Sequence, residues 1–369
     1  MVTKTYQAYF SRPGMGFDEA VGGLLAFLKE LTSNHLTPVK IYIALGSDTQ
    51  TDLAVRQRQL IETVGSVLPG RVPALTAVVQ PPVDNSPLLA EIWCVEQAEA
   101  CRFLHIGNLP HVLVEQAGII ELWSSGFVAD SPEKAFGSLS SLLEQTGFTY
   151  DDIFRQWNYV GHILQEKTVE GKCVQNYQHF NDIRALHYQN KRIRDQYPAA
   201  TGIGMDCPGI CIDFVAVKTA EGSPVRNLPV KSPVQKDAYA YQDKVLVGES
   251  VVLPAKNAPL FERGRCLKTE QGGLAMISGT ASIKGEETVD LDDIKKQTSN
   301  TIEFIQDLLR NEAHARCARA RLYVKQGQDP TEAVRIFRQS YPQDCVRTAV
   351  FADICRNNLL IEIEADWNL

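Results

Sequence analysis

The chain has 369 residues, 44% of them hydrophobic and 22% charged, which is typical of a globular protein that is neither disordered nor embedded in a membrane. A formal net charge of -7 argues against binding to a nucleic-acid backbone, because proteins that bind it usually carry a basic excess. The length is sufficient for two or three domains, each with its own core.

The sequence gives no signal for export, membrane insertion or metal binding. Its first ten residues, MVTKTYQAYF, do not form the apolar core of a signal peptide, and no apolar run approaches the ~18 residues of a membrane span, so we expect a cytoplasmic protein without membrane contact. Nine scattered cysteines are typical of reduced thiols. Cys207 and Cys211 have no matching Cys or His pair nearby, and TGIGM at 201–205 is not a dinucleotide fingerprint. We therefore expect no metal and no organic cofactor.

The first hundred residues are predicted to follow the order helix, strand, helix, strand, strand. The expected helices are 17–33 and 51–68, and the expected strands are 38–46, 72–80 and 88–96. The same order is predicted again in the middle of the chain, where Ser131 and Pro132 give a helix start signal. There the expected helices are 131–147 and 176–196, and the expected strands are 151–164, 197–205 and 209–217.

The order occurs a third time towards the end of the chain. The expected helices are 291–309 and 329–341, and the expected strands are 320–325, 346–354 and 359–367. A fixed order of elements that repeats is stronger evidence than any single propensity. The sequence therefore predicts an α+β fold with three modules of about a hundred residues in tandem. The predicted module boundaries are 1–101, 102–220 and 236–369.

The last predicted strand, LLIEIEADW, carries two carboxylates on one face. Glu362 and Glu364 are two residues apart, and the pleat of a strand directs such side chains to the same side. If a second layer covers that face, one of the two acids is expected to retain a proton and to be suited to general acid catalysis. The alternative is an exposed, solvated strand face. We align Glu362 with the acids Glu91 and Asp213 of the other modules, so that Glu364 is the additional acid of the third module.

The segments YP, VRTAV and LLIEIEA, in this order, resemble the RidA superfamily. That resemblance implies α+β modules of the chorismate mutase-like type, which assemble as trimers with ligand sites in the clefts between subunits. It further implies that Arg347 binds a substrate carboxylate and that Glu364 acts on water or a proton. Three copies in one chain then imply a pseudo-trimer. An exposed arginine on an edge strand is the alternative for Arg347.

Six motifs, in the right order from about residue 155 to the end, narrow the resemblance to the chorismatases. They are RQWNYVGHI, NYQHFNDIR, YPAATGIGM, LFERGR, MISGTASIKGEE and ADICRNNLLIEIEA. The resemblance implies cleavage of chorismate to pyruvate and a hydroxybenzoate without a cofactor. Two positions depart from the pattern, because Val234 stands where an arginine is expected and Glu286 where a histidine is usual.

Chorismate has two carboxylates and an enol ether, so its cleavage requires cationic groups and one protonated carboxyl. By resemblance, the acid is Glu362 or Glu364. Cys355, seven residues before Glu362, resembles the branch that forms 3-hydroxybenzoate, and Gly264 is the candidate for the glycine that lines the pocket in that branch. The candidate substrate-binding residues further include three arginines and two tyrosines: Arg347, Arg184, Arg155, Tyr177 and Tyr239.

Several of these residues have a structural alternative. Arg184 is equally compatible with a solvated helix face, Arg155 with a packed core, and Cys355 with a small core residue. Two other functions remain open, namely a RidA-like enamine or imine deaminase, which needs Arg347 but not Cys355, and a non-catalytic module that binds a small molecule. The expected partner is a small carboxylate such as chorismate, with no nucleic acid. Both a monomer and a homo-oligomer are compatible with the sequence.

Overall fold

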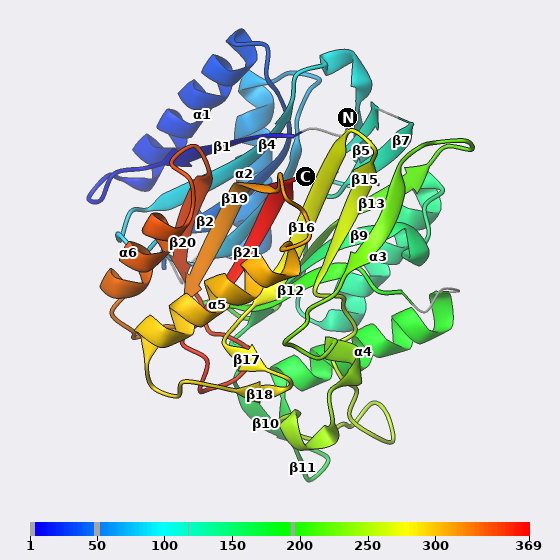
Figure 1. The fold of residues 1–369 in the computed structure, drawn as a ribbon. Helices are drawn as coiled ribbons and strands as arrows, with labels where there is room; N and C mark the ends of the chain where they lie inside the picture. The colour runs from blue at the N-terminus through cyan, green and yellow to red at the C-terminus, as the bar shows by residue number, and fades with distance from the viewer. Residues whose placement is uncertain (1–3, 48–51, 117, 193–195) are drawn as a thin grey trace.

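The computed structural model describes residues 4–47, 52–116, 118–192 and 196–369. The first module is a four-stranded sheet with two helices on one face (Figure 1). Its strands, in spatial order, are β1 (Thr5–Phe10), β4 (Leu88–Val95), β2 (Thr37–Leu45) and β3 (Ala74–Val79), and its helices are α1 (Phe17–Ser33) and α2 (Leu53–Val67).

The second module is a seven-stranded sheet with two helices. Its strands, in spatial order, are β12 (Ala199–Met205), β9 (Ile153–Gly161), β13 (Ile210–Thr219), β7 (Ile119–Trp123), β6 (Leu109–Gln116) and β5 (Cys101–Ile106), with β8 (Phe127–Ala129) paired to β13. The helices are α3 (Pro132–Thr146) and α4 (Asn176–Lys191), and a hairpin of β10 (Glu166–Val169) and β11 (Lys172–Gln175) precedes α4.

The third module is a six-stranded sheet, again with two helices. Its strands, in spatial order, are β14 (Arg226–Val230), β15 (Gly264–Thr269), β16 (Gly272–Thr280), β21 (Ile361–Asn368), β19 (Arg316–Val324) and β20 (Val346–Phe351). Its helices are α5 (Ile294–Leu308) and α6 (Thr331–Ser340), and a small hairpin of β17 (Ile283–Lys284) and β18 (Glu287–Thr288) precedes α5.

The three modules share one pattern of strand pairing. In each, the strand between the two helices runs parallel to the strand after the second helix and antiparallel to the last strand, as in β2 with β3 and β4. The same holds for β9 with β12 and β13, and for β19 with β20 and β21. The predicted fold class, α+β with tandem modules that form a pseudo-trimer in one chain, is confirmed. The module boundaries given above stay a prediction.

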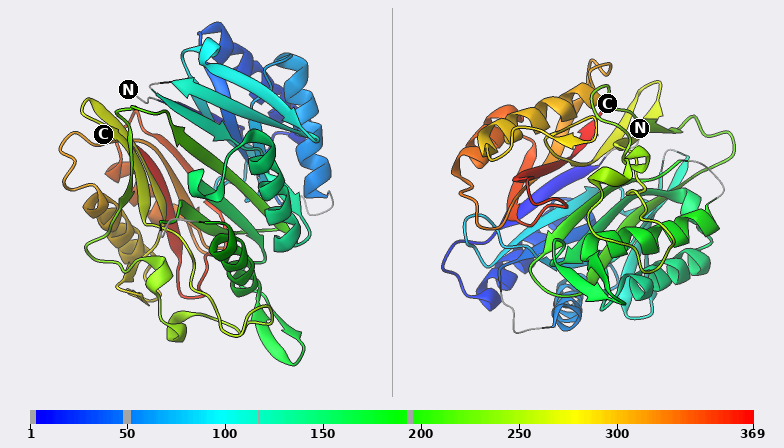
Figure 2. Two further views of the ribbon diagram at one scale, coloured as in Figure 1. Left: turned by 90° about the vertical axis from the view of Figure 1, so that its right-hand side faces the viewer. Right: turned by 90° about the horizontal axis from the view of Figure 1, so that it is seen from below.

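The sheets meet at the centre of the molecule and the helices lie outside (Figure 2). The largest buried apolar cluster joins side chains of all three modules, among them Trp93, Trp157 and Tyr323. The helix-free faces of the sheets therefore bury one another, which explains why their last strands are buried on both faces over almost their whole length. None of the described helices is long and apolar enough to cross a membrane.

The sequence prediction missed the strands that precede the first helix of each module. These are β1 in the first module, β5 to β8 in the second, and β14 and β15 in the third. Strand β5 shows why, because its sequence CRFLHI has no clear alternation and its side chains are half-buried or exposed. The prediction also extended one helix to residue 196, but α4 ends at Lys191, and 193–195 lie outside the described residues.

Candidate active site

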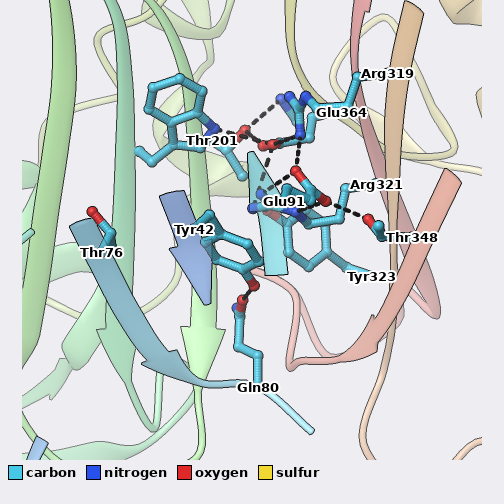
Figure 3. Close-up of polar contacts among 12 residues, drawn as sticks. Tyr42, Thr76, Gln80, Glu91, Thr201, Arg319, Arg321, Tyr323, Thr348 and Glu364 are labelled. Carbon is cyan, nitrogen blue, oxygen red and sulfur yellow. Dashed lines mark hydrogen bonds and ion pairs between the residues drawn. The ribbon is translucent and has the colours of Figure 1, made fainter. Parts of the chain in front are cut away.

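Three buried acids lie where the sheets meet, one from the last strand of each module. Each accepts a hydrogen bond from a threonine of another module. Figure 3 shows two of these acids, Glu91 and Glu364, with their threonines. The pairs are Thr76 with Asp213 (2.7 Å), Thr201 with Glu364 (2.6 Å), and Thr348 with Glu91. The contacts thus run in a ring from the first module to the second, from the second to the third, and from the third back to the first.

Each acid also forms an ion pair with a cation, and this cation comes from the same module as the threonine that bonds the acid. These ion pairs are Lys40 with Asp213, Arg155 with Glu364 (2.8 Å), and Arg319 with Glu91 (2.8 Å). In each module a β-bulge comes directly before the cation, at the shifts from Pro38 to Lys40, from Ile153 to Arg155 and from Cys317 to Arg319. Because a bulge redirects the next side chain, it turns the cation toward the centre of the molecule.

This ring corrects the alignment of the acids. Glu364 lies opposite Arg321 in its sheet, as Glu91 lies opposite Tyr42, so Glu364 is the counterpart of Glu91 and Asp213. The alignment with Glu362 was wrong by two residues. A shift of two residues leaves both acids on the same face of the strand, so the period of the pattern cannot detect it.

Glu362 is therefore an acid that the other two modules lack at the equivalent position. Glu362 lies opposite Tyr323 in its sheet. By the same strand pairing, its counterpart in the first module is Leu89, which lies opposite Ala44, and its counterpart in the second is Cys211, which lies opposite Tyr159.

Glu364 is held as an anion. Burial opposes its ionisation, but the guanidiniums of Arg321, Arg155 and Arg319 outweigh burial and keep its pKa well below the usual range. The indole Nε1 of Trp157 also donates a hydrogen bond of 3.0 Å to this carboxylate. Glu364 thus belongs to the buried ionic network at the centre of the pseudo-trimer (Figure 3).

A cavity lies between the second and third modules, and Glu362 forms part of its wall. It encloses about 680 Å³, part of it open to solvent. Strand β12 and helix α4 border it on one side, and β16, the start of β21 and the loops before β15 and β21 border it on the other. Its polar lining side chains are Gln175, Tyr177, Gln178, Asn181, Tyr241, Arg263, Cys355, Arg356 and Glu362.

Glu362 has the opposite electrostatics to Glu364. Its side chain is almost completely buried, and among the described residues its carboxyl makes no hydrogen bond within the protein. Burial, followed by the negative charge of Glu364, raises its pKa to about 8, although Arg155 and Arg263 oppose the rise. Glu362 therefore carries its proton at neutral pH and presents it to the cavity.

Two arginines supply positive charge to the cavity wall. Arg263 donates through Nε and Nη2 to the carbonyl oxygen of Lys236, at 3.0 and 2.5 Å, and through Nη2 to the hydroxyl of Tyr241 at 2.5 Å. Arg356 donates through Nη1 to the carbonyl oxygen of Glu286 at 2.8 Å. Both guanidiniums lie near the Tyr241 ring, at 5.5 and 5.4 Å from its centroid. No carboxylate pairs with either arginine among the described residues, so their charge is available to an anionic ligand.

Helix α4 contributes a polar wall opposite these arginines. Tyr177 and Asn181 are four residues apart and so lie on one face of the helix. Asn181 accepts a hydrogen bond of 2.7 Å from Nη2 of Arg184, which fixes the amide, while its Nδ2 is buried without a partner among the described residues. An unpaired buried donor on a cavity wall is suited to an acceptor oxygen of a ligand.

Comparisons with known proteins identify similar sequences and a similar fold. A sequence family described as chorismatase FkbO/Hyg5-like, N-terminal, matches residues 93–216. The 3-hydroxybenzoate synthase of Streptomyces hygroscopicus is 29% identical over 256 residues, which is 65% of this chain and 70% of the relative. A chorismatase of Streptomyces rapamycinicus is 25% identical over 67% of this chain and 72% of its own length. The resemblance to the chorismatases is confirmed.

The fold is also that of a chorismatase. A chorismatase crystal structure matches with a TM-score of 0.68 and 20% identity, and the match covers 99% of each chain. Because it extends over the whole chain, the match includes the first module, whose sequence resembles the chorismatases only in outline.

Three of the predicted site residues line the cavity: Glu362, Cys355 and Tyr177. Burial and the neighbouring Glu362 raise the pKa of the Cys355 thiol to about 12, so this thiol is neutral at physiological pH. Glu364, Arg155 and Arg184 lie behind the wall, where they hold other side chains in place.

The other three predicted residues are not among the residues that line the cavity. Arg347 does not share it with the two glutamates, because its guanidinium donates to the carbonyl oxygens of Arg338, at 2.7 Å, and Tyr341 at the end of α6. Tyr239 bonds Lys231 and Asp237 instead. Gly264 packs against side chains and backbone of its own sheet. The pairing of β19 with β20 determines which side of the sheet Arg347 faces, and local sequence does not encode that.

The sequence reasoning missed Arg263 and Arg356 as candidate ligands. Both belong to motifs that the resemblance identified, LFERGR and ADICRNN. Treating every arginine and lysine of those motifs as a candidate ligand would therefore have found them. The two departures from the motifs also lie outside the lining. Val234 accepts a backbone hydrogen bond from Gly285, and Glu286 pairs with Lys236 and Lys244. Among the described residues, no group of three or more His, Cys, Asp and Glu side chains is arranged to hold a metal ion.

Proposed function

We propose that this chain cleaves chorismate to pyruvate and a hydroxybenzoate, the 3-isomer, by protonating the enol ether. The observation that carries the proposal is Glu362, a buried carboxyl with a pKa of about 8 in a cavity that also contains the guanidiniums of Arg263 and Arg356. The names of the relatives, 3-hydroxybenzoate synthase and chorismatase, support it.

The two arginines would bind the carboxylates of the substrate. A dianion requires two cations, and a charge-assisted hydrogen bond to a carboxylate is among the stronger polar contacts in proteins. Both guanidiniums are held by backbone carbonyls, so they are positioned before the substrate arrives. The side chains of Asn181 and Tyr177 on the opposite wall would form hydrogen bonds with the ring hydroxyl.

Glu362 would then transfer its proton to the methylene carbon of the enolpyruvyl group. The electron pair of the double bond forms the new C–H bond, and the positive charge is shared with the ether oxygen as an oxocarbenium ion. For the dihydrodiol, water would add to the oxocarbenium carbon, and the hemiketal would then break the bond between this carbon and the ether oxygen, which releases pyruvate and leaves both oxygens on the ring. For the hydroxybenzoate, the neighbouring ring hydroxyl would add to this carbon instead. Its bond to the ring would then break, a ring proton would be lost as the ring becomes aromatic, and cleavage of the bond between the same carbon and the other ring oxygen would release pyruvate. Formation of a hydroxybenzoate consumes no water overall, whereas formation of a dihydrodiol consumes one water. No redox change occurs, so we expect no metal and no organic cofactor.

Cys355 lies next to Glu362 on the cavity wall and would direct the outcome. A neutral thiol is a poor hydrogen-bond partner for water, so it keeps the space beside the cation dry. We therefore assign Cys355 to the choice between the hydroxybenzoate and the dihydrodiol.

The test is incubation of the purified protein with millimolar chorismate, with pyruvate followed by a lactate dehydrogenase assay and the aromatic product identified by chromatography against standards. We expect stoichiometric pyruvate and 3-hydroxybenzoate. Absence of pyruvate from the wild-type protein would favour a non-catalytic binding module. The position of Arg347 outside the cavity disfavours the deaminase alternative, which needs this arginine. We retain the cytoplasm as the expected compartment, and module boundaries at 1–101, 102–220 and 236–369.

A further inference from the structure

We propose that Glu286 is a positioning residue for the two arginines of the cavity, Arg263 and Arg356. The inference rests on the proposed function, in which these arginines bind the substrate. Glu286 is not among the residues that line the cavity, but segment 236–247 contributes Tyr241 and three apolar residues to the lining. Among residues 236–247, all of which the structure describes, the backbone forms no strand and only two short 3-10 turns. Contacts with the rest of the protein therefore hold this segment in place.

The carboxyl of Glu286 holds segment 236–247 at three points. Its Oε2 accepts a hydrogen bond of 3.1 Å from the backbone N–H of Gln242 and lies 3.1 Å from Nζ of Lys236, while its Oε1 lies 3.5 Å from Nζ of Lys244. The N–H of Gln242 and the two lysines lower the pKa of this carboxyl, so it is ionised at neutral pH. The carboxyl is buried, but the side chains of the lysines are 46% and 60% exposed. Because ion pairs with exposed lysines contribute little, the bond to the backbone of Gln242 is the principal contact.

Segment 236–247 in turn fixes the guanidinium of Arg263. The carbonyl oxygen of Lys236 accepts hydrogen bonds from its Nε and Nη2, at 3.0 and 2.5 Å, and the hydroxyl of Tyr241 accepts another from Nη2 at 2.5 Å. The ammonium of Lys236 pairs with Glu286, and Tyr241 directly precedes Gln242. The N–H of Lys236 also donates a backbone hydrogen bond of its own. Loss of the carboxyl of Glu286 would therefore release Tyr241 more than Lys236.

Glu286 also holds the second arginine directly. The carbonyl oxygen of Glu286 accepts a hydrogen bond of 2.8 Å from Nη1 of Arg356. The guanidiniums of Arg263 and Arg356 lie 5.5 and 5.4 Å from the centroid of the Tyr241 ring, so the position of this ring affects the spacing of the two cations. A substrate with two carboxylates depends on that spacing, because both must reach a cation in the same bound orientation. Glu286 thus acts on one arginine through its main chain and on both through Tyr241.

The first experiment compares Glu286→Ala with its matched control, Glu287→Ala. Glu287 pairs with Lys244 at 2.9 Å, but its side chain is 60% exposed. Glu286→Ala should raise KM for chorismate about 10-fold, the lower end of the range for loss of a hydrogen bond to a charged group. It should change kcat less than about threefold, because Glu362 is untouched. Glu287→Ala should change both constants less than about threefold, as expected for an exposed ion pair. A KM for Glu286→Ala equal to that of the control would overturn the proposal.

Glu286→Gln separates the hydrogen bond from the charge. The amide oxygen can still accept from the N–H of Gln242, whereas the charge that attracts the two lysines is lost. Since the bond to Gln242 is the principal contact, this variant should restore KM to within about threefold of wild type. A KM as high as that of Glu286→Ala would contradict this account of the positioning.

A second experiment is independent of turnover. Chorismate is titrated calorimetrically into Glu362→Gln, which has no acidic proton to transfer, with and without Glu286→Ala and Arg263→Ala. Glu286→Ala should raise Kd about 10-fold, and by less when Arg263 is already absent, because residues that act through one another are not additive. Equal increases in both backgrounds, or no binding of chorismate to Glu362→Gln, would overturn the inference. The expected increases together with a wild type that releases no pyruvate would retain Glu286 as a positioning residue while removing the proposed function.

Discussion

Glu362 and Glu364 share one face of β21, yet the first is protonated and the second ionised at neutral pH. Three guanidiniums hold the charge of Glu364, whereas Glu362 faces a cavity and lies beside that charge. Because the charge of Glu364 raises the pKa of Glu362, substitution of Glu364 tests the environment of Glu362. The two residues are thereby assigned different roles, one in the chemistry and one in the ionic centre of the fold.

Glu362→Gln should abolish pyruvate release while the protein stays folded. The amide has nearly the shape of the carboxyl but no acidic proton to transfer, so kcat should fall at least 100-fold, as for loss of a general acid. The measurement is pyruvate release together with circular dichroism and thermal denaturation of the same preparation. Turnover that survives in both Glu362→Gln and Glu364→Gln would contradict the mechanism.

The wild-type rate should decline as the pH rises through about 8, the pKa of Glu362, because the acid must be protonated to act. A profile of kcat between pH 6 and 10 checks this. A rate that is constant across this range would show that no group with this pKa acts as the acid.

The same pKa predicts a pH dependence of stability. The folded pKa of about 8 lies above the ordinary value of 4.5, so between these limits the folded state retains a proton that the unfolded chain has released. The free energy of unfolding should therefore decrease as the pH rises across this window, by up to about 1.4 kcal/mol per pH unit. Urea denaturation at several pH values should show a smaller decrease for Glu362→Gln than for wild type.

Glu364→Gln should destabilise the protein by about 3–5 kcal/mol, the usual cost of removing one partner from a buried ionic network. Arg155, Arg319 and Arg321 would each lose a partner at the centre of the molecule. The measurement is urea denaturation at neutral pH, with Glu362→Gln as the matched control. A loss no larger than that of the control would show that Glu364 is not essential to the network.

Arg263→Ala should raise KM for chorismate about 10- to 100-fold, the range expected for loss of a charge-assisted hydrogen bond to a carboxylate. Arg347→Ala is the control, since its guanidinium bonds backbone carbonyls at the end of α6, outside the cavity. Steady-state kinetics of both variants test the assignment. A larger rise in KM for Arg347→Ala than for Arg263→Ala would show that Arg347 binds the substrate.

Cys355→Ala should shift the product from 3-hydroxybenzoate toward a dihydrodiol. The smaller side chain leaves room for water beside Glu362, where the cation forms. Chromatography of the aromatic products after complete conversion measures the ratio, and pyruvate release should persist. An unchanged product ratio would show that Cys355 is only a packing residue.

The sequence by itself determined the repeated order of elements and the placement of Glu362 and Glu364 on one face, because both follow from the periods of helix and strand. The motifs that surround the cavity also identified Tyr177, Cys355 and the pair of glutamates as candidates. These features depend on residues that are neighbours in sequence, so local patterns are sufficient to predict them.

Only the tertiary structure decided which of the two glutamates belongs to the buried ionic network and which faces the cavity. The ring from Thr201 to Glu364 and its two counterparts joins residues far apart in the chain, and pairing between strands sets their register. The same long-range pairing turns Arg347 toward α6 and brings Arg263 to the cavity. Periodicity specifies the face of a strand but neither its register nor its neighbour, and a pKa depends on those neighbours because charge interactions act through space rather than along the chain.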